Sequence, residues 1–326
     1  MDELCKAIIL KPTANGSIRS ERTVLNYASN MRLLYKRMED KPWDYDVVYF
    51  KNNAKRVCEY LSNTYKMGTA QNYLSSIIIS LQANELEVPE EYSNLMLSNG
   101  EILRSEQNKQ AKTASENVNW TTISALQKHL KTKKKALDLR SVFRKDFKDL
   151  TYFEKNLLRD WVVGNLYIGD ENNPPLRADY CMKITTVKDY KNVDKNENYL
   201  VIQGRNKKFF HLGKYKTSSH YGEKIIPVGS KLNKVLNLYL QVHKETDFLI
   251  YTNRGVAVTP DTLAKLVPQA FKELDFKGKH ITINLLRHIY ISEFLPEGGP
   301  TLSDKTEIAG KMLHSVVLQE KYKKME

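Results

Sequence analysis

Apolar residues recur at intervals of three and four along much of the first hundred residues. This spacing predicts amphipathic helices, because positions three and four apart share one helix face. The best example, over 17–39, has a basic outer face and apolar positions at Val24, Tyr27, Met31, Leu34 and Met38. The same criterion predicts helices over 45–63, over 69–84 with Thr69 as its cap, and over 90–104 after Pro89. Residues 1–104 are therefore predicted to form an all-helical domain.

A polar stretch follows this helical region. Residues 105–118, SEQNKQAKTASENV, contain no aromatic residue and a single valine. Such a segment has too little apolar surface to be buried, so 105–118 is the predicted linker and 119–326 the predicted second domain.

The pattern changes after Trp120. Helices are predicted over 120–135 and 151–168, and then over 230–243, 261–274, 283–294 and 303–312. Between them lie three short runs rich in β-branched and aromatic residues, Tyr199–Gln203, Phe209–Leu212 and Lys224–Val228. The predicted fold class is mainly α with a small antiparallel β-sheet inserted among the helices.

Composition narrows the possible partners. The 326 residues are 41% hydrophobic and 27% charged, with no apolar run of about 18 residues and no signal peptide pattern. We therefore expect an intracellular protein without a membrane span. Cys5, Cys58 and Cys181 are far apart and fit neither a disulfide framework nor a zinc site. A net charge of +13 favours a polyanionic partner, either a nucleic acid or an acidic membrane.

Two segments of the second domain contain basic residues in constrained settings. In PPLRADY, 174–180, two prolines stiffen the approach to Arg177, which is predicted at the start of a helix. A guanidinium held there could contact a phosphate through two hydrogen bonds, although an isolated arginine is more often an ordinary surface residue. In GKYKTSSHYGEKIIPV, 213–228, Lys216 lies near the end of a strand, where it could donate a proton or simply be solvated.

Two later segments add an arginine, a histidine and a tyrosine. Within INLLRHIYISEFL, 283–295, Arg287 has apolar neighbours at helical spacing, so it needs a partner, either an internal carboxylate or a ligand phosphate. In KMLHSVVLQEKYKK, 311–324, His314 precedes Ser315, a good N-cap. Tyr322 is predicted at the far end of the short helix that Ser315 begins.

Taken together and in this order, these segments resemble the active site of the tyrosine recombinase/integrase family. The versions PPLRADY, LLRHIYISE and MLHSVVLQEKY are most similar to those of eukaryotic DNA viruses and their mobile elements. The resemblance covers nearly the whole chain. It implies an N-terminal helical core-binding (SAM-like) domain and a C-terminal catalytic domain that close around DNA as a clamp.

The resemblance also assigns roles to six residues. Tyr322 is the nucleophile that forms a covalent 3′-phosphotyrosyl link, and Lys216 is the general acid. Arg177, Arg287 and His314 stabilise the phosphate in the transition state. Asn284 stands where the family's pattern has a histidine, so it is only an auxiliary ligand. Tyr180 replaces the acid expected after the first arginine, with Asp179 one residue earlier.

The implied function is site-specific, metal-independent cleavage and rejoining of double-stranded DNA without any cofactor. The resemblance further implies a homo-tetramer on paired sites. Two alternatives remain open at this stage: a type IB DNA topoisomerase, which uses the same residues, and a DNA-binding relative that has lost catalysis. An association with host nucleus, cytoplasm or viral factory does not follow from the sequence.

Overall fold

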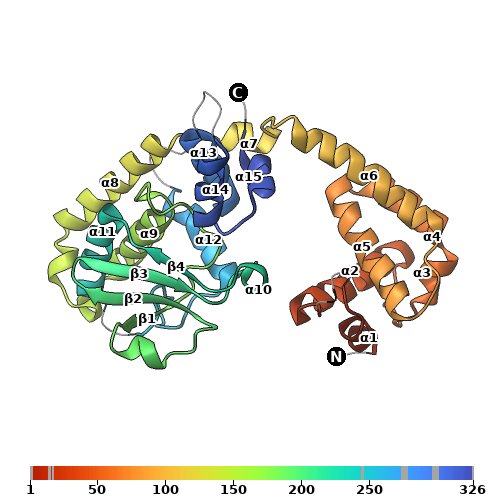
Figure 1. Ribbon diagram of the computed structural model, residues 1–326, viewed down its shortest axis with the longest axis horizontal. Helices are drawn as coiled ribbons and strands as arrows, with labels where there is room; N and C mark the ends of the chain where they lie inside the picture. Colours follow the sequence, from red (N-terminus) through yellow and green to blue (C-terminus); the bar gives the residue numbers. More distant parts are fainter. Residues whose placement is uncertain are drawn as a thin grey trace. The chain divides into compact units, whose positions relative to one another are not determined.

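The computed structural model describes residues 3–13, 16, 18–243, 246–272, 278–295 and 301–324. They form two compact units, Met1–Lys109 and Gln110–Glu326. Figure 1 shows the elements of each unit. No helix within the described ranges has the length and apolar character needed to cross a membrane.

The regular structure described in the first unit is entirely helical. Its apolar helix faces pack around α5, and Met31, Leu34, Leu61, Leu74 and Ile77 are completely buried. Its helices are α1 (Glu3–Leu10), α2 (Glu21–Glu39), α3 (Val48–Asn52), α4 (Ala54–Thr64), α5 (Met67–Ala83) and α6 (Glu90–Asn108).

The described residues confirm the four predicted helical regions of this unit, with three differences. The stretch predicted as one helix over 45–63 is divided at Asn53, whose side chain donates to the Tyr49 carbonyl (2.9 Å). Thr69 does not cap α5, because that helix already begins at Met67 after Lys66. The helix α1 was not predicted. Ser20, by contrast, caps α2 by accepting from the Thr23 N–H.

The second unit combines helices with one sheet. Helix α9 lies at its centre and is buried along most of its length, in contact with α8, α11, α12 and α13. The helices are α7 (Ala114–Asn119), α8 (Ile123–Leu139), α9 (Tyr152–Ile168), α10 (Ser218–Tyr221), α11 (Ser230–Val242), α12 (Pro260–Ala270), α13 (Ile283–Phe294), α14 (Leu302–Lys311) and α15 (Val316–Tyr322). Three short 3₁₀ turns lie at Val142–Arg144 (η1), Phe147–Asp149 (η2) and Asp189–Asn192 (η3).

The sheet has four strands in the order β1-β2-β3-β4. They are β1 (Lys183–Thr186), β2 (Asn198–Gly204), β3 (Lys207–Leu212) and β4 (Lys224–Pro227). The three predicted strands are present and pair antiparallel, but the prediction of a purely antiparallel sheet is wrong. The unpredicted β1 pairs parallel with β2, with Lys183 opposite Tyr199, so the sheet is mixed. Figure 1 shows the strands side by side at one edge of this unit.

The stretch predicted as a linker contains helical residues. Helix α6 continues to Asn108, and α7 begins at Ala114 after a capping box between Thr113 and Glu116. From Gln110 onward the chain belongs to the second unit. Residues 273 and 274, at the end of the helix predicted over 261–274, lie outside the described residues.

Candidate active site

Among the described residues of the second unit, Arg287 is the most deeply buried cation. Thr282 caps α13, and the apolar neighbours of Arg287 hold that helix in the core, so the side chain is 0% exposed. Its guanidinium donates to the carbonyls of Pro175 (2.6 Å) and Met312 (3.3 Å) and to Nδ1 of His314 (2.8 Å). All three acceptors are uncharged. No carboxylate is among the hydrogen-bond partners described for Arg287, although the charge of Asp179 raises its pKa.

Burial lowers the pKa of Arg287, since a charged guanidinium is costly in the interior, while Tyr322 acts in the opposite direction. An arginine nevertheless stays protonated in proteins. Its Nε atom is buried and finds no hydrogen-bond partner among the described residues. The site therefore holds a positive charge whose hydrogen-bonding capacity is incompletely used.

The turn Met312–His314 joins this arginine to Arg177. Leu313 has φ 57°, a left-handed conformation that costs a non-glycine residue about 1–2 kcal/mol. Its carbonyl accepts from Arg177 Nη1 (3.2 Å) and from Thr217 Oγ1 (3.1 Å). The carbonyl groups of this strained turn thus accept hydrogen bonds from both arginines and from Thr217, the residue that follows Lys216.

Arg177 itself lies in a loop and not at the start of a helix as predicted. Its backbone is fixed at both ends: the Tyr167 hydroxyl donates to its carbonyl (2.7 Å), and its N–H donates to Asp179 Oδ2 (3.1 Å). Burial raises the pKa of Asp179, although the charge and backbone N–H of Arg177 oppose that change. The half-buried Arg177 side chain is left facing the Leu313 turn.

His314 is neutral at physiological pH. Burial, followed by the charge of Arg287, lowers its pKa to about 3. Because Nδ1 accepts from Arg287, the ring proton belongs on Nε2, which faces Gln319 Oε1 at 3.4 Å. The Gln319 contact is long for a hydrogen bond, so this N–H is only weakly engaged in the free protein.

Tyr322 packs over His314 and Arg287. Ser315 caps α15 as predicted, and the helix ends at Tyr322. The tyrosine ring stacks on His314 (centroids 5.4 Å apart, planes at 16°) and lies 4.9 Å from the Arg287 guanidinium carbon. Four of the six predicted residues, Arg177, Arg287, His314 and Tyr322, thus belong to one contact network.

The other two predicted residues lie at its margin. Lys216 is exposed, in the connection between β3 and β4, where the short helix α10 makes the turn longer than a tight hairpin. Asn284 is also exposed and lines a hollow of about 330 Å³ together with residues of α7. It lies one turn before His288 on α13. Among the described residues, no hydrogen bond or ring contact joins either side chain directly to Arg287, His314 or Tyr322.

Three residues outside the six predicted site residues, His288, Glu116 and Lys324, hold the tyrosine segment. His288 Nδ1 lies 2.7 Å from the Tyr322 carbonyl, and Glu116 of α7 lies 3.4 Å from His288 Nε2 and 3.3 Å from Lys324 Nζ. Burial opposes the charged form of Glu116, but hydrogen bonds from Thr113 and the charges of His288 and Lys324 outweigh it and lower its pKa. The T-x-x-E spacing of Thr113 and Glu116 is a capping-box signal that could have revealed α7.

Among the described residues, no group of three or more histidine, cysteine, aspartate or glutamate side chains could hold a metal ion.

Comparisons with known proteins give little. No family model matches the sequence, and no curated protein matches it. Among solved structures, the crystal structure of XerA recombinase is similar over 99% of this chain and 94% of its own, with 16% identity and a TM-score of 0.40. A likeness of that size assigns neither fold nor activity to this chain.

Proposed function

We propose that this chain is a DNA strand transferase that cleaves and rejoins duplex DNA through a covalent phosphotyrosyl intermediate, as the resemblance to tyrosine recombinases implies. The observation that carries the proposal is the pairing of Tyr322 with Arg287. A fully buried guanidinium with only neutral hydrogen-bond partners lies under the ring of a tyrosine. A buried cation with no carboxylate among its hydrogen-bond partners can bind a phosphate.

The proposed chemistry uses only side chains of this chain. The Tyr322 oxygen attacks the phosphorus and loses its proton to water, and the bond from phosphorus to the 5′-oxygen breaks. Lys216 gives that oxygen a proton, so that it leaves as a hydroxyl. Arg177 and Arg287 stabilise the negative charge that grows on the phosphoryl oxygens, and His314 donates from Nε2. Attack by a 5′-hydroxyl on the phosphotyrosine reverses these steps and rejoins the strand without ATP.

The free protein is not yet arranged for this reaction. Arg287 is completely covered, partly by Tyr322, so a phosphate can reach it only after the tyrosine ring moves. His314 Nε2 likewise has to leave Gln319 before it can donate to a phosphate. We therefore expect DNA binding to displace α15 from the position it has in the free chain.

Duplex DNA is the proposed partner, and the net charge of +13 supports a polyanion. Assembly as a tetramer on paired sites, and closure of the two units around DNA, are proposed on the family resemblance alone. A type IB DNA topoisomerase would use the same chemistry as the proposed recombinase. The all-helical first unit favours the recombinase.

A nicked duplex substrate tests the proposal, since loss of a short strand after cleavage traps the covalent adduct. Wild-type protein should form an adduct that survives denaturing electrophoresis, and peptide mapping should place it on Tyr322. Tyr322→Phe should abolish it while costing only about 1 kcal/mol of stability, because the ring contacts with His314 and Arg287 remain and only the interaction of the hydroxyl with Arg287 is lost.

Tyr221→Phe is a matched control, because this partly buried tyrosine packs against the same core and lies at the end of α10, in the same β3–β4 connection as Lys216. It should form the adduct at the wild-type rate. An adduct that persists in Tyr322→Phe, or that maps to another residue, would refute the proposed role of Tyr322.

A further inference from the structure

A buried asparagine holds the connection that contains Lys216. Asn198, the first residue of β2, is 7% exposed. Its Oδ1 accepts from the Lys214 N–H (2.8 Å), and its Nδ2 donates to the Lys214 carbonyl (2.8 Å) and to the Asp179 carbonyl (3.2 Å). One side chain therefore hydrogen-bonds to both backbone polar groups of Lys214, which lies two residues before Lys216. The same side chain also hydrogen-bonds to the segment that follows Arg177.

The base of this connection is fixed by further contacts. Gly213 approaches the 195–198 segment so closely that a Cβ atom there would lie 1.9 Å from the Lys195 carbonyl oxygen. Beyond Lys214, the Tyr215 hydroxyl donates to the Gly222 carbonyl (2.7 Å) and closes the loop on itself. Thr217 Oγ1 then reaches the Leu313 turn. Lys216 lies between these fixed points with its side chain exposed.

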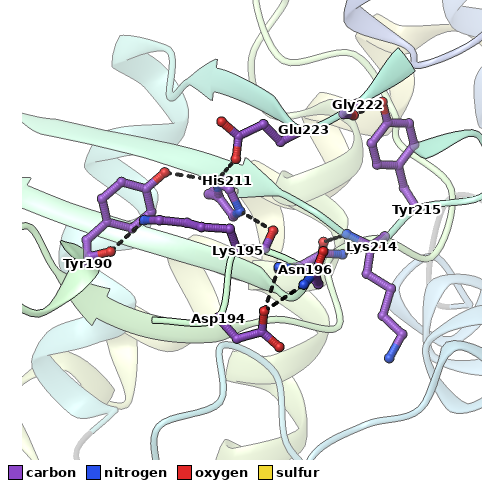
Figure 2. A network of polar contacts seen from close by, with 10 residues as sticks. Tyr190, Asp194, Lys195, Asn196, His211, Lys214, Tyr215, Gly222 and Glu223 are labelled. Carbon is purple, nitrogen blue, oxygen red and sulfur yellow. Dashed lines mark hydrogen bonds and ion pairs between the residues drawn. The ribbon is translucent and has the colours of Figure 1, made fainter. Parts of the chain in front are cut away.

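The segment that supports Asn198 is itself anchored to β3 by His211 (Figure 2). This histidine is 0% exposed, with Nε2 at 3.0 Å from the Lys195 carbonyl and Nδ1 at 2.9 Å from the Tyr190 hydroxyl. A carbonyl only accepts, so Nε2 carries the proton and Nδ1 accepts from Tyr190. Figure 2 shows Lys214 and Tyr215 leaving the sheet beside this network. The segment that leads into Asn198 is therefore itself hydrogen-bonded to β3.

We propose that Asn198 is a positioning residue for Lys216: its three hydrogen bonds set where the lysine ammonium meets the leaving oxygen, relative to Arg177. The inference rests on the proposed function. A misplacement of about 1 Å in a reacting group can slow a reaction about 100-fold, so a residue that fixes the backbone beside the general acid matters for rate.

The sharpest perturbation is Asn198→Asp. The two side chains have nearly the same shape, but a carboxylate cannot donate, and its second oxygen would face the carbonyls of Lys214 and Asp179. The connection should shift, while Tyr322, His314 and Arg287 stay in place. If this variant is too unstable to purify, Asn198→Ser is the second choice, because its short hydroxyl cannot span both groups of Lys214.

The experiment measures the rate of adduct formation by the full chain on two nicked duplexes. One has the normal 5′-oxygen at the scissile bond and the other has sulfur there, which leaves as a thiolate without needing a proton. Asn198→Asp should be about 10- to 100-fold slower than wild type on the oxygen substrate and within a few-fold of wild type on the sulfur substrate. Lys216→Ala should show the same pattern. In the double variant, the loss on the oxygen substrate should not exceed that of Lys216→Ala alone.

Asn173→Asp is the matched control. Asn173 is 2% exposed and makes the same kind of bidentate contact, accepting from the Gly229 N–H (2.6 Å) and donating to the Pro227 carbonyl (2.9 Å), at the end of β4. Any slowing it causes should be equal on both substrates.

Three results would overturn the inference. In the first, Asn198→Asp slows the reaction of both substrates equally, which would make Asn198 a structural residue. In the second, Asn198→Asp slows the reaction of neither substrate. Absence of an adduct from wild-type protein on both substrates would refute the proposed function itself, and this inference with it. An active wild type with no sulfur rescue of Asn198→Asp refutes only the positioning role.

Discussion

The two candidate arginines should differ sharply in what they contribute to stability. Arg287→Ala should lower the free energy of opening of α13 far more than Arg177→Ala, although both should slow adduct formation. The difference follows from burial: Arg287 is 0% exposed, whereas Arg177 is half-buried.

The size of the effect follows from the acceptors left behind. Arg287→Ala removes the donor from the carbonyls of Pro175 and Met312 and from His314 Nδ1. Each buried acceptor without a partner costs about 1–3 kcal/mol, so three cost about 3–9 kcal/mol. Two effects reduce this total: the variant no longer buries a guanidinium, and water can enter the space that the side chain leaves. We therefore expect Arg287→Ala to lower the free energy of opening by about 3 kcal/mol. Arg177→Ala leaves the Leu313 carbonyl with its Thr217 bond and should cost at most about 1 kcal/mol.

Native-state hydrogen exchange, read by mass spectrometry on peptides from α13, measures this difference in the full chain, because it reports opening of the second unit separately from the first. Arg287→Lys is the matched control for charge: it keeps a cation but cannot serve three acceptors in a plane. Equal exchange in the Arg287→Ala and Arg177→Ala variants would show that the buried network does not depend on Arg287 as described.

Two further predictions concern pH and salt. The pKa of His314 in the folded chain, about 3, lies below its unfolded value of about 6.5, so stability from this group is complete above pH 6.5 and is lost as pH falls toward 3. Wild type should therefore lose up to about 1.4 kcal/mol more per pH unit over that range than His314→Gln in urea titrations, and parallel curves for the two would contradict the buried neutral histidine. Duplex DNA binding should weaken about 10³- to 10⁵-fold between 50 and 200 mM salt if about 6–10 phosphates are contacted, and a flat titration would exclude the DNA partner.

The sequence predicted the larger helices because their stability comes from local periodicity. The apolar stripes of α2, α5, α9 and α13 are complete within each segment, and the structure has these helices within a few residues of the predicted ranges. Elements that depend on distant partners were missed. The strand β1 is only four residues long and exists through its backbone pairing with β2.

Helix α7, within the predicted linker, also depends on partners that are distant in the sequence and was therefore not predicted. Its polar sequence has no stripe to bury, yet Glu116 faces His288 and Lys324, and Gln110 donates to the Glu320 carbonyl (2.9 Å). These partners lie about two hundred residues away in the chain. No local pattern identifies such contacts, so a polar stretch was assigned as a linker although part of it is tied to the helix that ends at Tyr322.

For the candidate site, residue types were predictable but their partners were not. Arg287 was expected to face either a carboxylate or a ligand phosphate, and the structure surrounds it with two carbonyls and a neutral histidine. That choice of partners has a physical consequence. A carboxylate would neutralise the guanidinium and compete with a phosphate for it, whereas neutral acceptors use some of its N–H groups and leave the charge in place.

Asp179 is an acid whose charge acts on both arginines, but its described hydrogen bond is to a backbone N–H. Asp179 accepts from the backbone N–H of Arg177, and burial raises the pKa of its carboxyl group. Its bond to the backbone fixes the loop without occupying the Arg177 guanidinium, whose partner is the Leu313 carbonyl. Both arginines therefore rest on neutral acceptors that meet at one left-handed turn. In the proposed complex, a phosphate would meet two guanidinium groups whose described hydrogen-bond acceptors are neutral, so no direct side-chain ion pair of theirs would have to break, although the charge of Asp179 also acts on both arginines.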